Sequence, residues 1–424
     1  MSTLYKFKNI YFIYSNKEEL MKISLTTQML LALVLGCVCG LIVSAVGISP
    51  AYFKPLGDIF ITLIRMVVVP LVFTTLVAGA SSVGDLHKLG NIAVKTLCYY
   101  VGTTAIAVTI GVVIANVIQP GVGLTISTEG VKALNVNPPS LLKVFMDIIP
   151  LNPFEALTKG NMLQVIFFAL FVGMACSTLK KEYEVVLRMF EGLAEIMLKI
   201  TTAIMYYAPI GVFGLMTFTV GTYGLDVLLP LLELIITMFV ACILHILLCY
   251  VPCIRFTGLK IRQFFKGIAS PLLIAFTSTS SAAALSTNLQ SVQKLGASKP
   301  VSSFMIPLGN TINMDGAAIY MGVAGIFAAA LYGIDLTIDK QLLIIVMAVL
   351  ASIGSIGVPG AALIMITMVF TQVGIPLEAI AVIAGVDRIL DMMRTSLNVL
   401  GDATGALFVS KLEGDFVLPQ DSEE

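Results

Sequence analysis

The chain has 424 residues, of which 58% are hydrophobic and 12% charged, and its 25 basic and 25 acidic side chains give a formal net charge of zero. Soluble domains carry about 25% charged residues, so this composition, with a mean hydropathy of +0.98, excludes an ordinary soluble protein. The sequence has no basic patch that would indicate a nucleic-acid partner. Several uncharged runs reach the roughly 20 residues that a bilayer core requires, which predicts an all-α polytopic membrane protein.

The N-terminal segment, residues 1–24, is mixed and mildly basic and has no small-residue cleavage site. It lacks the pattern of a signal peptide, so we expect a cytoplasmic tail, and an extension before a natural start at Met21 stays open. Further Lys and Arg residues cluster between the second and third expected spans, at 180–188 and at 255–266. Positive charge is enriched in cytoplasmic loops, and this distribution also places the N-terminus in the cytoplasm.

Six spans are expected in the first 250 residues. Residues 119–160, between the third and fourth spans, are rich in Pro, Gly and Asn and predict irregular structure with broken helices. The seven cysteines lie mostly in apolar segments and predict packing residues without a disulfide framework. His245 and Cys249 share a helix face but lack the second pair of a metal site, so core packing is favoured. The six spans cover residues 25–46, 56–80, 93–118, 162–179, 184–218 and 225–250.

Two long uncharged segments are interrupted by residues that do not sustain a helix. Residues 267–293 contain Thr277-Ser-Thr-Ser-Ser281, whose hydroxyl groups compete with the helix backbone for hydrogen bonds. Residues 342–377 contain Ser352-Ile-Gly-Ser-Ile-Gly-Val-Pro-Gly360, which is too rich in glycine to stay helical. Non-helical backbone at membrane depth is tolerated only inside protein or beside a water-filled cavity. Both segments predict re-entrant hairpins, and a polar-faced spanning helix stays open for the first.

A long span with polar residues follows each predicted hairpin. The first carries Gly309-Asn-Thr-Ile-Asn313-Met-Asp315-Gly316, and the second carries a polar stripe whose members fall within about 80° on a helix. Charge within a membrane is costly and usually functional, although a structural ion-pair face stays open. Interrupted segments at corresponding places in two halves indicate a midplane binding site in secondary transporters. The stripe consists of Asp387, Asp391, Arg394, Asn398 and Asp402.

The residues near Asp315 offer oxygen atoms suited to a hard cation. Unwinding beside this carboxylate would free backbone carbonyls, and broken membrane helices use such carbonyls to coordinate Na⁺. Asp402, with the backbone at Asn398 and Gly309, can form a second site of this kind. Three residues on one face of the third span can complete the first site with further oxygens: Tyr100, Thr103 and Thr104.

Asp391 and Arg394 have the chemistry of a substrate site. A carboxylate pairs with a cationic amine, and a guanidinium binds a carboxylate through two parallel hydrogen bonds. Together they describe a zwitterionic substrate with a second acid group. Backbone N–H groups and half-helix N-termini at the hairpin tips also favour anionic substrate groups.

With these motifs in this order, the chain resembles the dicarboxylate/amino acid:cation symporter family, which includes glutamate transporters and neutral amino acid exchangers. The resemblance covers about residues 25–410. It implies eight transmembrane helices and two re-entrant hairpins in an inverted-repeat fold, a homotrimer among membrane lipids, an elevator-type movement and a bacterial inner membrane. It also implies scaffold helices at 25–90 and 119–223, a transport-domain helix at 91–118, the rest of the transport domain at 224–410 and a C-terminal tail at 411–424.

The resemblance assigns roles to individual residues. Asp391 would hold the substrate amine, Arg394 its side-chain carboxylate and Asn398 its α-carboxylate. The pocket would be completed by Ser280, Ser281, Ala317, Val358, Ala362 and Thr395. About three Na⁺ sites are implied: Tyr100, Thr103, Thr104, Asn313 and Asp315; Gly309, Asn313, Asn398 and Asp402; and Thr311, Ser352, Ile353 and Ser355.

Two positions depart from the family pattern. Ala317 stands where acidic amino acid transporters of the family usually have threonine, and Thr279 stands where some prokaryotic members have arginine. A charge-assisted pair with Arg394 outweighs one missing hydroxyl, so aspartate or glutamate is the expected substrate. A C4-dicarboxylate or a neutral amino acid stays open, as does an anion channel. An intramembrane enzyme built on the serine stretch is disfavoured, because neither His87 nor His245 lies in a segment paired with it.

Overall fold

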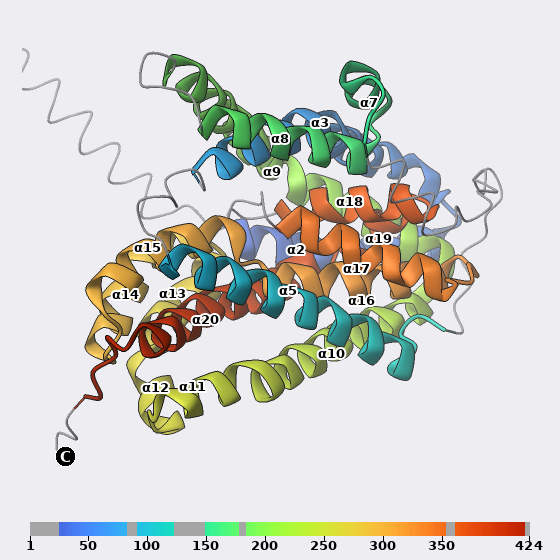
Figure 1. Ribbon diagram of the computed structural model, residues 1–424. Coiled ribbons are helices and arrows are strands. Elements are labelled where there is room, and N and C mark those ends of the chain that lie inside the picture. Colours follow the sequence, from blue (N-terminus) through green and yellow to red (C-terminus); the bar gives the residue numbers. More distant parts are fainter. Residues whose placement is uncertain (1–24, 83–90, 123–148, 178–183, 353–360, 420–424) are drawn as a thin grey trace, which may run out of the picture.

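The computed structural model describes residues 25–82, 91–122, 149–177, 184–352 and 361–419. Every regular element within these ranges is helical (Figure 1), which confirms the all-α class. Five helical stretches in the described part of the chain are long and apolar enough to cross a membrane. They are Thr27–Val46, Pro50–Ala78, Asn91–Ile118, Glu184–Thr257 and Lys299–Leu331.

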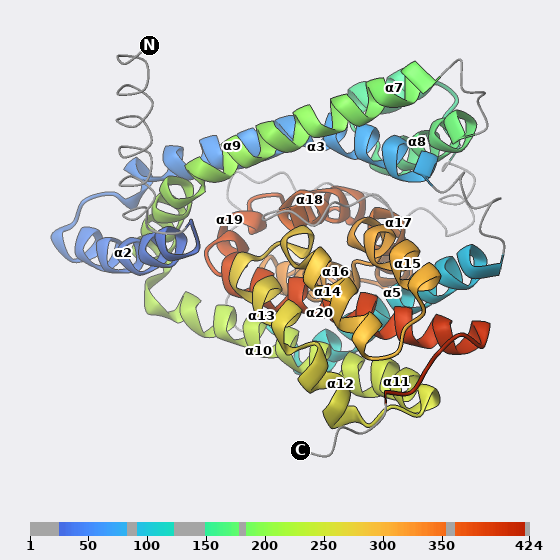
Figure 2. The same ribbon diagram turned by 90° about the vertical axis from the view of Figure 1, so that its left-hand side faces the viewer.

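One side of the molecule is a layer of four helices that contact one another, α3 against α8 and α9, and α2 against α9. Figure 2 shows this layer crossing above the remaining helices. The α2 helix turns apolar side chains such as Leu35 and Val38 outward, as expected for a surface that meets lipid or another apolar surface. The elements of this side are α2 (Leu25–Val46), η1 (Pro50–Tyr52), α3 (Lys54–Ser82), α7 (Pro153–Lys159), α8 (Met162–Ser177) and α9 (Glu184–Tyr223).

The other side is built around α16, which is almost entirely buried, and α20, which is mostly buried. The α16 helix contacts α5, α10 and α20, and α20 in turn contacts α13, α14 and α15. The central elements are α5 (Asn91–Ile118), η4 (Gly224–Val227), α10 (Leu228–His245), the π-helical turn η5 (Ile246–Tyr250), α11 (Val251–Thr257), α15 (Lys299–Ile312), α16 (Asp315–Leu331), α19 (Ala379–Ala384) and α20 (Asp387–Glu413).

The serine-rich segment is divided into two short helices, α13 (Ala269–Ser278) and α14 (Ser281–Lys294), which follow α12 (Ile261–Gly267). Thr279 between them has φ +52°, and the Ser280 side chain caps α14 by accepting a hydrogen bond from the Ala283 N–H. The predicted break at the hydroxyl-rich stretch is therefore present. Its re-entry into a bilayer stays a prediction.

The second interrupted segment contains α17 (Ile338–Ser352) and α18 (Ala361–Val373), which contact each other and α16. The glycine-rich stretch between them, residues 353–360, lies outside the described residues. The predicted spans agree closely with the helices found. Two helices continue beyond their predicted ends. The α9 helix continues to Tyr223 instead of ending near residue 218, and the sixth span, predicted to end at residue 250, continues through η5 and α11 to Thr257.

Candidate functional site

The centre of the molecule contains a break between α15 and α16. Asn313 and Met314 leave the helix: Asn313 has extended backbone angles, φ −90° and ψ 94°, and Met314 has non-helical angles, φ −122° and ψ 46°. The predicted unwinding of this span is thereby confirmed. The break turns the side chains of Asn313 and Asp315 into the middle of the helix bundle, where both are 0% exposed.

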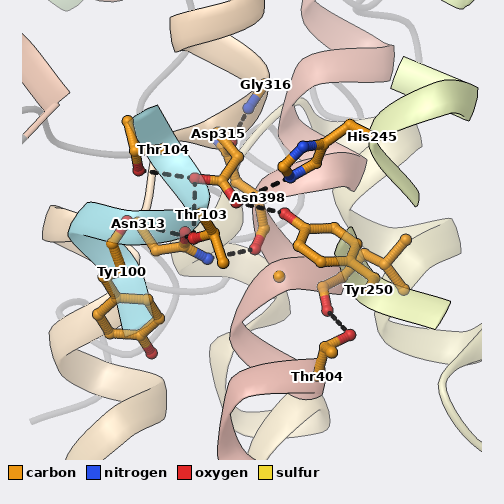
Figure 3. A network of polar contacts seen from close by, with 12 residues as sticks. Tyr100, Thr103, Thr104, His245, Tyr250, Asn313, Asp315, Gly316, Asn398 and Thr404 are labelled. Atoms are coloured by element: carbon orange, nitrogen blue, oxygen red, sulfur yellow. Dashed lines mark hydrogen bonds and ion pairs between the residues drawn. The ribbon is translucent and has the colours of Figure 1, made fainter. Parts of the chain in front are cut away.

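Asp315 accepts hydrogen bonds on both carboxylate oxygens (Figure 3). Its Oδ1 faces α5, where Thr104 Oγ1 lies at 2.7 Å and Thr103 Oγ1 at 3.4 Å. Its Oδ2 faces the end of α10, where the Tyr250 hydroxyl lies at 2.6 Å and His245 Nε2 at 3.2 Å. A buried carboxylate requires such donors, because removing an ion from water is expensive.

Asn313 connects this carboxylate to the polar stripe of α20. Its Nδ2 donates to Asp402 Oδ1 at 2.9 Å and to the Asn398 carbonyl at 3.2 Å. Its Oδ1 is buried without a hydrogen-bond partner among the described residues. Buried polar atoms are nearly always paired, so this oxygen is placed to accept a ligand.

Position 309 requires glycine, because the side chains of Asp402 and Tyr100 leave no space there for a Cβ atom. A Cβ there would overlap the Asp402 carboxylate and lie 2.5 Å from the Tyr100 hydroxyl oxygen. That hydroxyl donates to the Met305 carbonyl at 2.8 Å and does not reach Asp315. Tyr100 therefore lines this centre as expected, with its own hydrogen committed to α15.

This centre presents carboxylate, hydroxyl, amide and carbonyl oxygens, which are the ligands that hard cations prefer. The described residues contain no cluster of three or more His, Cys, Asp and Glu side chains that could hold a metal ion. The donors present at this centre are neutral oxygens around single carboxylates, which fit a hard cation. The unpaired oxygen of Asn313 is the specific sign of that fit.

The second polar centre surrounds Arg394, which is 2% exposed. Its Nη1 donates to Asp387 Oδ1 at 2.8 Å, and its Nε lies 3.0 Å from Asp391 Oδ1. The guanidinium carbon lies 4.5 Å from the centroid of the Tyr320 ring, and the Tyr320 hydroxyl donates to Asp387 at 2.8 Å. Thr395 donates to Asp391 at 3.3 Å. Arg394 is thus held between two carboxylates and an aromatic face.

Arg388 lies at the edge of this centre. Its Nη1 is 3.7 Å from Asp391 Oδ2, and the residue is 6% exposed. Asp391 therefore faces two arginines, one through each carboxylate oxygen. Arg388 lies outside the polar stripe of α20, and its burial shows that this flank of the helix also faces protein.

The first hairpin tip reaches the break in α15 and α16. Ser281 Oγ donates to Asn310 Oδ1 at 2.7 Å. The Asn398 amide spans the break, since its Oδ1 accepts from the Gly316 N–H at 2.8 Å and its Nδ2 lies 3.2 Å from Met314 Sδ. The α20 stripe is therefore tied directly to the unwound residues.

The remaining predicted residues are placed as follows. Ala317 and Ala362 are buried. The Thr311 hydroxyl donates to the Leu308 carbonyl at 2.9 Å, and the Ser352 hydroxyl to the Val349 carbonyl at 2.7 Å, so both serve their own helices. Three predicted residues lie outside the described residues: Ile353, Ser355 and Val358.

Four residues of these centres were not predicted or were given a lesser role. Asp387 was placed in the polar stripe without an assigned ligand, and it pairs directly with Arg394. His245 was assigned to core packing, and it is buried, but its ring contacts Asp315. Tyr250 and Tyr320 carried no signal, because an aromatic side chain in an apolar helix has the same hydropathy pattern whether its hydroxyl meets a carboxylate or a carbonyl.

The whole chain is similar to known transporters. A family model for the sodium:dicarboxylate symporter family matches residues 25–412. A proton/sodium-glutamate symport protein of Geobacillus stearothermophilus is 38% identical over 403 residues, covering 93% of this chain and 96% of the relative. A proton/glutamate-aspartate symporter of Escherichia coli (strain K12) is 36% identical over 411 residues, covering 93% and 94%.

A C4-dicarboxylate transport protein of Anaeromyxobacter sp. (strain K) is 34% identical over 400 residues, covering 92% of this chain and 90% of the relative. These relatives are transporters and not enzymes, which agrees with the expectation from the sequence. The matched length leaves no large part of the described helices outside the shared region. Together with the broken helix and its two polar centres, the comparisons show that the chain belongs to the sodium:dicarboxylate symporter family.

Proposed function

We propose that this protein is a sodium-coupled symporter of acidic amino acids, with aspartate or glutamate as the substrate. One observation carries the proposal. The helix α20 buries a cationic and an anionic side chain that can bind a substrate, and both lie beside a centre that is suited to a cation. Arg394, Asp391 and Asp402 are 2%, 4% and 3% exposed. Buried charges of this kind are rare in membrane helices and mark substrate or ion pathways.

In this proposal, Asp391 binds the substrate amine and Arg394 binds the side-chain carboxylate. Asn398 binds the α-carboxylate through its amide, which already lies across the helix break. Both charged side chains are held in place by buried neighbours, because Arg394 pairs with Asp391 and Thr395 donates a hydrogen bond to Asp391. The pocket would be completed by Ser280, Ser281, Ala317, Val358, Ala362 and Thr395.

About three cation sites accompany the substrate in this proposal. Bound Na⁺ would supply positive charge that balances Asp315 and Asp402 when an anionic substrate is present. The unpaired Asn313 oxygen supports a site between α5 and the break. The proposed sites consist of Tyr100, Thr103, Thr104, Asn313 and Asp315; of Gly309, Asn313, Asn398 and Asp402; and of Thr311, Ser352, Ile353 and Ser355.

The layer of α2, α3, α8 and α9 in Figure 2 supports a division of the chain into a scaffold and a transport domain. In this division, α5 and the helices from α10 to α20 carry the substrate, with α13–α14 and α17–α18 as re-entrant hairpins. The scaffold would join three copies in a bacterial inner membrane, with the N-terminus in the cytoplasm. The transport domain would then move across the membrane against that fixed layer.

Uptake by the purified protein in liposomes tests this proposal. Labelled aspartate or glutamate should accumulate when an inward Na⁺ gradient is applied and should not accumulate when choline replaces Na⁺. A matched arm applies an inward proton gradient in Na⁺-free buffer, because the Escherichia coli relative is named a proton symporter. Equal uptake in that arm would contradict the sodium assignment.

Transport of a C4-dicarboxylate is the second candidate, because one similar protein is named a C4-dicarboxylate transport protein. Ala317, a buried methyl group, departs from the pattern of the acidic amino acid transporters and keeps the choice of substrate open to test. A panel of aspartate, glutamate, succinate, fumarate and serine, read by thermal shift with and without Na⁺, separates the candidates. The true substrate should raise the melting temperature, since a ligand that binds only the folded state stabilises it.

A further inference from the structure

The Asp315 carboxylate has a second set of contacts that comes from one π-helical turn. The α10 helix ends at His245, η5 covers Ile246–Tyr250, and α11 begins at Val251 without a break in the chain of turns. In a regular α-helix, residues i and i+5 would point about 140° apart. The wider π-turn brings the side chains of His245 and Tyr250 to one side, and both reach Asp315 Oδ2. Single π-turns of this kind are frequent at functional sites.

The side chains of His245 and Tyr250 pack directly against each other. Their rings lie edge to face with centroids 4.7 Å apart, and both residues are 0% exposed. The His245 Nε2 lies 3.2 Å from Asp315 Oδ2, and the tautomer that carries a proton on Nε2 can donate a hydrogen bond to this oxygen. The His245 Nδ1 is buried without a partner among the described residues. Among the described residues, Asp315 is therefore the polar group that the His245 ring contacts. Buried polar atoms are usually hydrogen-bonded, so the contact with Asp315 is the interaction that accounts for a histidine in this buried position.

The opposite helix is shaped to admit this pair. A Cβ at Gly401 of α20 would lie 2.5 Å from the Tyr250 hydroxyl oxygen and 2.6 Å from Asn313 Nδ2. Glycine at that position thus leaves space for both the tyrosine hydroxyl and the amide that faces the proposed cation site. The contact between α10 and Asp315 depends on a fit between three separate helices.

The two oxygens of Asp315 consequently have different surroundings. Oδ2 is occupied by Tyr250 and His245, whereas Oδ1 faces Thr103 and Thr104 (Figure 3). We propose that His245 and Tyr250 are positioning residues for a monovalent cation, which hold Oδ2 and thereby direct Oδ1 toward the hydroxyls of α5 and the free amide oxygen of Asn313. This inference rests on the proposed function, because it assumes that Asp315 binds a cation.

The expected loss of Na⁺ affinity can be taken from measurements on other metal sites. Hydrogen-bond partners that orient a ligand typically change metal affinity by 10- to 100-fold when they are removed. Tyr250→Phe removes one donor and keeps the ring that packs against His245. His245→Leu removes the other donor, and His245→Gln retains a side-chain N–H of similar reach. Tyr99→Phe is the matched control, since its buried hydroxyl contacts the Gly401 carbonyl at 3.2 Å and not Asp315.

The test is an equilibrium Na⁺ titration of the purified full chain without substrate, read by calorimetry and by melting temperature. Tyr250→Phe and His245→Leu should each raise the dissociation constant for Na⁺ by about 10-fold or more, while His245→Gln restores most of the affinity. Tyr99→Phe should bind Na⁺ as the unaltered chain does. Uptake should return to its full maximum at high Na⁺, because a positioning role changes cation affinity and not the transport step.

The outcomes separate the two hypotheses. If the unaltered chain shows no Na⁺-dependent change, the proposed sodium coupling fails. If it binds Na⁺ and both donor-removing variants retain its affinity, the positioning role is overturned while sodium coupling stands. An equal loss in Tyr99→Phe would also overturn the role, because the effect would then come from packing. If Tyr250→Phe does not fold, the comparison of His245→Leu with His245→Gln decides the same question.

Discussion

Arg394 and Asp387 form a two-point contact, with Nη1 at 2.8 Å from Oδ1 and Nη2 at 3.4 Å from Oδ2. The third donor of Arg394, Nε, is directed to Asp391 at 3.0 Å. The guanidinium is therefore paired with two carboxylates. An anionic substrate group must share this arginine with them, and a substrate amine can release Asp391 for that purpose.

Replacing Arg394 with cysteine should abolish the uptake of acidic substrates. The change removes a two-point charge-assisted contact to the substrate carboxylate, in which each hydrogen bond is worth about 1.5–3 kcal/mol. It also leaves Asp387 and Asp391 buried without their common partner. We expect kcat/KM for aspartate or glutamate to fall by more than about 100-fold, since 1.4 kcal/mol corresponds to about 10-fold. Uptake of labelled substrates in liposomes measures this, with serine and alanine included because the enlarged neutral pocket can admit them. Unchanged acidic uptake would show that Arg394 does not bind substrate.

Asp391→Asn should separate amino acids from dicarboxylates. If Asp391 binds an amine, the variant loses a charge-assisted contact worth about 1.5–3 kcal/mol for aspartate or glutamate only. Succinate has no amine, so its binding should change much less. Competition of unlabelled aspartate and succinate against a labelled substrate measures the ratio.

Asp387→Asn is the matched control for that experiment. It removes a carboxylate from the same arginine, at a position whose hydroxyl partner is Tyr320. Its effect should be similar for aspartate and succinate, because the contact orients Arg394 and does not meet the amine. An equal loss of both substrates in Asp391→Asn would contradict the role given to Asp391.

Gly309→Ala should remove sodium dependence or transport altogether. The added methyl group would overlap the Asp402 carboxylate and crowd the Tyr100 hydroxyl, so the oxygens of this centre would have to separate. Gly102→Ala is the control, because a Cβ there meets no heavy atom within 4 Å and alanine favours a helix over glycine by about 1 kcal/mol. We expect Gly102→Ala to keep the Na⁺-dependent thermal shift and Gly309→Ala to lose it. A normal shift in Gly309→Ala would place the cation elsewhere.

The hairpin tip should become more stable when Thr279 is replaced by asparagine. Its φ of +52° is left-handed, a conformation that is unfavourable for a β-branched residue and costs about 1–3 kcal/mol. Asparagine adopts it more readily, so Thr279→Asn should raise the melting temperature, whereas Thr279→Val should not. Thermal unfolding of the detergent-solubilised protein measures this, and lower stability of the asparagine variant would disprove the strain.

Much of the candidate site follows from the sequence alone. The hydroxyl-rich stretch ending at Ser281 and the Asn313–Gly316 motif predicted breaks that the structure contains at Thr279 and at Asn313. The α20 stripe predicted a buried polar face. These features could be predicted because they depend on local chemistry: hydroxyls and glycines weaken a helix where they stand, and charge in an apolar helix must be buried.

Only the tertiary structure decided which groups these residues meet. Asp315 is joined to His245 and Tyr250 from helices that lie far away in the sequence, and Arg394 is stacked on Tyr320. A periodic pattern shows that a side chain is buried, but the partner of a buried group is set by how several helices pack against one another. The sequence therefore determined where the polar centres lie along the chain. The packing of the helices determined that His245 and Tyr250, at the two ends of the π-turn η5, contact the Asp315 carboxylate.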